Sequence, residues 1–109
     1  MSQDATDIVE QIRRQEKSGD FRISRHALEE MAEEGISLEE TLEAIEGAEV
    51  LEDYAEHRRG PCCLLNGKTT VGRPLHVVTT TTQPTLVIIT VYEPKPPKWV
   101  SPEVRSRRP

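Results

Sequence analysis

Three polar side chains able to take part in acid–base chemistry lie in two otherwise apolar stretches of the chain. His76 lies within residues 72–78. Thr90 and Tyr92 lie within residues 86–92. Because side chains alternate between the two faces of a strand, antiparallel pairing of these stretches would place all three on one face. An imidazole, a hydroxyl and a phenol gathered there could transfer protons or hold a phosphate group.

The opposite face of the same two strands is predicted to belong to the core. It would carry the apolar side chains of Leu75, Val77, Val87, Ile89 and Val91. A histidine among such residues must find hydrogen-bond partners, or it costs stability. We expect His76 to be catalytic, with Thr90 and Tyr92 as its partners. The alternative is a structural histidine whose hydrogen bonds are satisfied.

Basic side chains elsewhere are candidates for the same site. His26 follows Arg25 in the first turn of a predicted helix, where the free amides favour a neutral imidazole suited to proton transfer. The alternative for His26 is simple packing at the helix entry. Arg58, beside Arg59, and Arg73 could bind phosphate through paired hydrogen bonds. The alternative for these arginines is an exposed basic turn.

The elements that must position these residues are predicted from periodicity and end signals. Three helices are expected within residues 4–46, with Ser24 as an N-cap, Gly35 as a stop, and Ser37 with Glu40 as a capping box. About four antiparallel strands are expected within residues 48–93, one of them closed by a turn at Asn66 and Gly67. This order predicts a single α+β domain spanning residues 1–109.

Prolines predict that residues 94–109 form an extended tail outside the sheet. Its arginines, Arg105, Arg107 and Arg108, are expected to be mobile. Trp99 is expected to anchor this tail over an apolar patch, the alternative being a platform on which a base stacks.

Composition narrows the function class. The net charge is −5, but 17 acidic and 5 basic residues lie up to position 56, against 2 and 9 beyond it. This asymmetry predicts either internal compensation between helices and strands or a basic strand face that attracts a polyanion. Adjacent Cys62 and Cys63 would point to opposite faces of a strand, so we expect two reduced structural thiols and neither a metal site nor a cofactor. Without a signal peptide or apolar span, a cytoplasmic protein with no membrane contact is expected.

The segments 25–37, 72–78 and 89–94, followed by Trp99, resemble the bacterial domain of unknown function 4258 family. Their pattern is also similar to that of BrnT-type toxins, which are similar in fold to RelE-type ribonucleases. The resemblance implies N-terminal helices packed on a curved antiparallel sheet, as in RelE and barnase, and metal-independent RNA cleavage by a toxin with a cognate antitoxin protein. Within the matching segments it implies roles for His26, His76, Thr90 and Tyr92.

The leading hypothesis is therefore a toxin-like, metal-independent endoribonuclease of a toxin–antitoxin system. Its catalytic residues would be His76, His26, Tyr92 and Thr90, and its phosphate-binding residues Arg58, Arg73 and Arg25. RNA, an antitoxin and a second copy in a homodimer are the expected partners. The alternative is a non-catalytic interaction domain, which the acidic helical face favours, and a metal-dependent enzyme ranks third.

Overall fold

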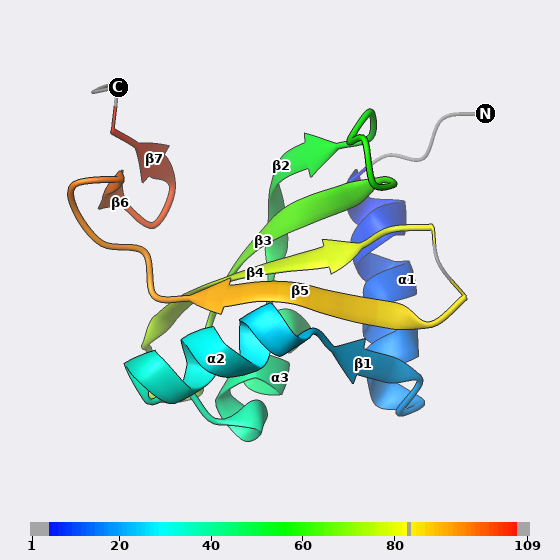
Figure 1. Ribbon diagram of the computed structural model, residues 1–109, viewed down its shortest axis with the longest axis horizontal. Coiled ribbons are helices and arrows are strands. Elements are labelled where there is room, and N and C mark those ends of the chain that lie inside the picture. The colour runs from blue at the N-terminus through cyan, green and yellow to red at the C-terminus, as the bar shows by residue number, and fades with distance from the viewer. Residues whose placement is uncertain (1–4, 83, 107–109) are drawn as a thin grey trace.

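Figure 1 presents the computed structural model, which describes residues 5–82 and 84–106. Three helices come early in the chain, with one short strand among them: α1 Ala5–Lys17, β1 Phe21–Ile23, α2 Arg25–Glu34 and α3 Leu38–Glu46. Strands follow: β2 Glu49–Tyr54, β3 Cys62–Lys68, β4 Pro74–Thr80, β5 Leu86–Tyr92, β6 Trp99–Ser101 and β7 Val104–Arg105. The expected α+β class is confirmed.

The main sheet has five strands in the order β1-β5-β4-β3-β2, one strand more than expected. Strands β2 to β5 are antiparallel neighbours, whereas β1 pairs parallel to β5 (Figure 1). The sheet is therefore mixed. A three-residue strand is too short to show a periodicity, and only its pairing with residues 86–88 makes it part of the sheet.

The helix ends follow the predicted signals. The Ser24 hydroxyl accepts a hydrogen bond from the amide of Ala27, which satisfies one of the free donors at the start of α2. Ser37 and Glu40 form the expected capping box at α3, each side chain accepting from the other's amide. Gly35 ends α2 in the left-handed conformation, with a φ of 65°.

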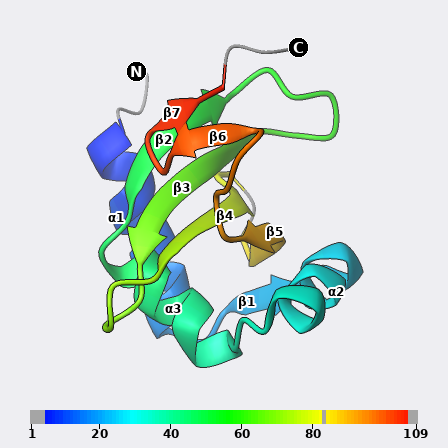
Figure 2. The same ribbon diagram turned by 90° about the vertical axis from the view of Figure 1, so that its left-hand side faces the viewer.

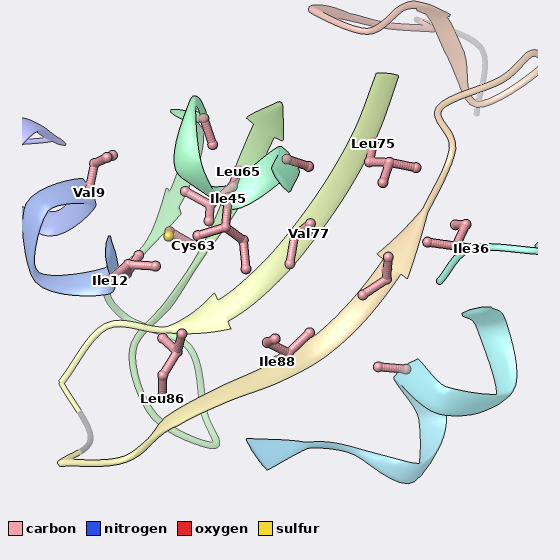
Figure 3. Close-up of a cluster of buried hydrophobic side chains, with 14 of the residues drawn as sticks. Val9, Ile12, Ile36, Ile45, Cys63, Leu65, Leu75, Val77, Leu86 and Ile88 are labelled. Carbon is pink, nitrogen blue, oxygen red and sulfur yellow. The ribbon is translucent and has the colours of Figure 1, made fainter. Parts of the chain in front are cut away.

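The core lies between one face of the sheet and the three helices (Figure 3). From β5 it takes Leu86, Ile88 and Val91, so the expectation that Val87 and Ile89 are core residues is wrong. The pairing of β4 with β5 shifts between Val78 and Thr79, which leaves Ile89 without a partner in the register. This irregularity reverses the alternation of faces along β5. Leu75 and Val77 of β4 lie in the core, as expected.

The expected turn at Asn66 and Gly67 is wrong, because β3 continues to Lys68. The reversal comes later, where the Gly72 amide donates to the Thr69 carbonyl and Gly72 has a φ of 91°. Gly67 serves packing instead: a Cβ on it would overlap the backbone of Ala44 in α3. Glycine is common in turns and also where two backbones approach closely, so sequence alone did not distinguish these uses.

The face of the sheet opposite the helices is called the outer face. Register places its side chains in cross-strand rows. Three of these rows are Tyr54, Cys62 and Thr80; then Glu52, Leu64, Val78 and Thr90; then Glu49, Asn66, His76 and Tyr92. His76, Thr90 and Tyr92 therefore share one face, as the alternation predicts.

Residues 94–106, called the strap, fold back over the outer face. Figure 2 shows their hairpin, β6 and β7, on the side of the sheet away from α3. The prediction of an extended, mobile tail is wrong for Arg105, which makes two hydrogen bonds to the Glu52 carboxylate at 2.8 and 2.9 Å. Arg107 and Arg108 lie outside the described residues.

Candidate functional site

A cleft separates α2 from the end of β5 and the start of the strap. We call it the α2 cleft, and its volume is about 570 Å³. Its lining residues are His26, Glu30, Glu34, Thr90, Tyr92, Glu93, Lys95, Lys98 and Trp99. The structure thus brings three of the predicted catalytic residues, His26, Thr90 and Tyr92, to one hollow.

Polar side chains of α2 hold this helix against β5. Within the described residues, the edge of β5 pairs with a strand only at β1, and further along this edge α2 and its N-cap supply hydrogen bonds. The Ser24 hydroxyl donates to the Ile89 carbonyl at 2.8 Å. Glu30 and Glu34 accept from the amides of Val91 and Glu93, both at 2.9 Å. These contacts satisfy an otherwise open strand edge and fix one wall of the cleft.

His26 lies on the cleft wall with about two thirds of its side chain exposed. Its Nε2 is 3.4 Å from Oε1 of Glu30, one turn further along α2. The two side chains therefore lie within ion-pair distance, and the pair forms only when the imidazole is protonated. Burial in turn raises the pKa of Glu30, opposed chiefly by its bond from the Val91 amide. His26 is thus accessible from the cleft and has a carboxylate beside it.

His76 is fully buried beneath the strap. Its Nε2 lies 2.7 Å from the Pro102 carbonyl oxygen, which only accepts, so Nε2 carries the proton. In the neutral ring Nδ1 is then the acceptor, and the Tyr92 hydroxyl donates to it at 3.0 Å. Burial lowers the pKa of His76 and favours this neutral form. His76 therefore has no direct access to a substrate.

Two aromatic rings enclose the His76 imidazole. Trp99 packs edge-on against it with ring centroids 4.4 Å apart, and Tyr92 does so at 5.2 Å. The Arg105 guanidinium lies 4.6 Å from the Trp99 ring centre. Trp99 is only 2% exposed, which fits the expected tail anchor and not an open stacking platform.

Tyr92 connects the buried histidine to the cleft. Its side chain is half-buried, and burial is the main cause that raises its pKa, so the phenol stays protonated near neutral pH. Because its proton points to His76, the phenol oxygen takes part in any further hydrogen bond as an acceptor, and the Trp99 side chain is one donor beside it. Thr90, two residues earlier on the same face, is also half-buried and lines the cleft.

The three predicted phosphate-binding arginines do not line the cleft. Arg73 has donors occupied by the carboxylates of Glu93 and Glu40 and the carbonyls of Glu34 and Gly35, at 2.8 to 3.3 Å. It thereby joins the end of α2, the start of α3 and the end of β5.

The other two arginines are exposed to solvent and do not line the cleft. Arg25 forms an exposed ion pair with Glu29 at 3.5 Å. Arg58 lies in the exposed turn between β2 and β3, in a shallow hollow with Glu56, His57 and Arg59. Neither arginine therefore lines the cleft with His26 and Tyr92, although Arg25 precedes His26 in the chain.

Two lysines take the place at the cleft that sequence reasoning assigned to arginines. Lys95 and Lys98 are exposed and line the α2 cleft from the strap. Sequence alone does not indicate them, because the prolines of residues 94–97 predict a segment outside the sheet. Their position immediately after the strand that ends in Tyr92 was the available signal.

The structure also places the cysteines on opposite faces, as expected. Both are free and buried; Cys63 belongs to the main core and Cys62 to the outer face. Burial raises the pKa of Cys63 to about 11, so its thiol stays protonated. Among the residues described, no three His, Cys, Asp or Glu side chains form a group able to hold a metal ion. No helix in the described ranges is long and apolar enough to cross a membrane.

Comparison with known proteins gives one result. The family described as "Domain of unknown function (DUF4258)" matches residues 23–93, which include all of α2 and most of the main sheet. No curated protein and no solved structure matches the chain at a significant level.

Proposed function

The chain belongs to the DUF4258 family, whose description assigns no function, and we propose that this member is a toxin-like, metal-independent endoribonuclease. The observation that carries the proposal is the meeting of His26, Tyr92 and two lysines in the α2 cleft. Two groups able to move protons and two cations are what cleavage of a phosphodiester through the RNA 2′-hydroxyl requires.

The direction of the Tyr92–His76 hydrogen bond supports a base at this position. The 2′-hydroxyl of RNA would give its proton to the Tyr92 oxygen while Tyr92 passes its own proton to Nδ1 of His76. His76 would thus act through Tyr92, without touching RNA. The burial that lowers the pKa of His76 keeps Nδ1 free to accept at neutral pH.

His26 is the matching acid. As the 2′-oxygen bonds to phosphorus, the bond to the 5′-oxygen breaks, and His26 in its imidazolium form protonates that leaving oxygen. The products are a 2′,3′-cyclic phosphate and a 5′-hydroxyl. Glu30 lies 3.4 Å from the His26 ring, and Lys95 and Lys98 stabilise the added charge on the phosphate oxygens.

The test is cleavage of a single-stranded RNA by the pure protein in the presence of EDTA. We expect cyclic-phosphate ends, and a loss of at least about a hundredfold in rate for His26→Asn and for Tyr92→Phe. Glu33→Gln, an exposed change on α2 outside the cleft, is the control and should leave the rate unchanged. Equal rates in His26→Asn and the wild type, or no cleavage by the wild type, would overturn the proposal.

The second candidate is a non-catalytic interaction domain. It is favoured by Leu28 in α2 and Leu38 at the start of α3, which are 51% and 41% exposed among acidic neighbours. Such a surface suits a protein partner with apolar and basic side chains. A folded wild-type protein that cleaves no RNA and forms a stable complex with such a partner would favour this candidate.

A further inference from the structure

A second cavity lies on the outer face, and the proposed reaction does not use it. We call it the outer-face pocket. Its volume is about 450 Å³, within the range of about 300–1,000 Å³ that is usual for small-molecule sites. The row of Tyr54, Cys62 and Thr80 contributes all its members, and the next row contributes Val78 and Thr90.

The interior of this pocket suits a flat, largely apolar group. Val78, Ile89 and Cys62 provide an apolar surface, and Tyr54 provides an aromatic one. The Tyr54 hydroxyl is bonded to Glu52, which is also paired with Arg105 of the strap. The backbone of Tyr54 is fixed in β2 and its hydroxyl is fixed by Glu52 before a ligand binds. Stacking of a ring on Tyr54 would therefore cost little side-chain conformational entropy.

A cation, Arg59, also lines the pocket. Arg59 is exposed, and it takes part in none of the ion pairs found within the described part of the chain. Its guanidinium is therefore available to a phosphate oxygen. Arg58, its neighbour, does not line this pocket, although both side chains lie on the same exposed turn.

The outer-face pocket and the α2 cleft are adjacent. Thr90 lines both of them, and Tyr92 follows it two residues later on the same face of β5. The Cα atoms of two residues that are two positions apart on a strand, such as Thr90 and Tyr92, are separated by about 7 Å. One nucleotide can therefore place its base in the pocket while the phosphate next to it lies in the cleft.

From this continuity we infer that the outer-face pocket is a base-binding subsite for single-stranded RNA. The inference rests on the proposed function, because it assigns to the pocket the base adjacent to the cleaved phosphate. The base stacks on Tyr54 over the apolar surface, the hydroxyls of Thr80 and Thr90 face its polar edge, and Arg59 binds the next phosphate. Duplex RNA is excluded, because its bases are paired and stacked inside the helix.

Binding of nucleosides and of the four nucleoside 5′-monophosphates, followed by calorimetry and by amide NMR shifts, tests the pocket without any cleavage. Shifts are expected at Val78 and Ile89. Val78→Phe fills the pocket and should weaken binding of both ligand types at least tenfold. Arg59→Gln should weaken the monophosphates severalfold and leave the nucleosides unchanged.

Matched controls separate these effects from general changes in fold or charge. Val100→Phe makes the same replacement on an exposed strap residue, and Arg58→Gln removes the neighbouring guanidinium. Both controls should bind nucleotides as the wild type does. Inorganic phosphate alone should bind far more weakly than a monophosphate. If Val78→Phe does not fold, the effect of Arg59→Gln and the NMR shifts of the wild type still show whether nucleotides bind in the outer-face pocket.

The outcomes distinguish the two proposals. Nucleotide binding in the pocket by a protein that cleaves no RNA keeps this site and overturns the ribonuclease. RNA cleavage by a protein whose pocket binds no mononucleotide overturns this site and keeps the ribonuclease. The base-binding subsite would also be overturned if Val78→Phe left nucleotide binding unchanged, or if the amide NMR shifts were confined to α2.

Discussion

The Tyr92 hydroxyl donates a hydrogen bond to Nδ1 of His76 at 3.0 Å. The other ring nitrogen of His76 donates to the Pro102 carbonyl in the strap. One buried imidazole therefore connects the last strand of the main sheet with the segment that folds over it. Both the stability of the strap and the proposed proton transfer depend on this ring.

Replacing His76 by leucine should destabilise the protein. The change leaves the Tyr92 hydroxyl and the Pro102 carbonyl, both partly buried, without their partner, and each lost hydrogen bond costs about 0.5–1.5 kcal/mol. Urea unfolding measures the loss. His57→Leu, at an exposed histidine, is the control and should change the free energy of unfolding by less than about 0.5 kcal/mol. Equal effects of the two changes would show that the buried ring does not hold the strap.

Stability should fall as the pH drops below about 6.5, the pKa of a histidine in an unfolded chain. Because burial lowers the pKa of His76, the unfolded chain binds a proton before the folded one does. The stabilisation is therefore complete above the unfolded pKa and is lost as pH falls toward the folded pKa. Unfolding measured from pH 7.5 to 5.5 should show a slope of up to about 1.4 kcal/mol per pH unit from this group. The same slope in His76→Leu would contradict this assignment.

Gly67→Ala should be strongly destabilising. The added methyl group would overlap the backbone of Ala44, which cannot yield as a flexible side chain does, and such overpacking costs about 1–3 kcal/mol or more. Gly47→Ala is the matched control, because nothing lies within 4 Å of the added atom and the φ of −106° suits alanine. Thermal unfolding of the two variants side by side makes the comparison. A tolerated Gly67→Ala would mean that β3 and α3 are not in close contact.

Arg73→Lys should lower the free energy of unfolding by about 1–2 kcal/mol, because an ammonium cannot match the bonds that the guanidinium makes at once. Arg25→Lys is the control, since that side chain is 93% exposed and its pair contributes little. Chemical unfolding at low and high salt measures both. Indistinguishable variants would argue that Arg73 does not join the three elements.

The double change Lys95→Gln and Lys98→Gln should lower the affinity for RNA and make that affinity less sensitive to the salt concentration. If both lysines contact phosphate, the slope of log affinity against log salt becomes shallower by about 1.4, or 0.7 per contact on a single strand. Binding of a single-stranded oligonucleotide to Tyr92→Phe, with and without the lysine changes, avoids interference from cleavage. Lys68→Gln, at an exposed residue outside the cleft, should leave the slope unaltered. A slope that does not respond to the double change would remove the lysines from the site.

Local signals in the sequence determined the helix ends and one shared face of the sheet. Ser24, Ser37 and Gly35 act on backbone groups only a few residues away, so their effect could be read without knowing the fold. The grouping of His76 with Tyr92 likewise followed from strand alternation, which is a property of the chain itself.

Only the tertiary structure decided which of these residues are accessible and what accompanies them. His76 is buried because the strap returns to it from 26 residues further along the chain. Arg73 is occupied by partners 20 to 39 residues away, while Lys95 and Lys98 reach the cleft left open beside α2. Such contacts depend on how the elements pack in space, and no short-range pattern of residue types specifies that packing.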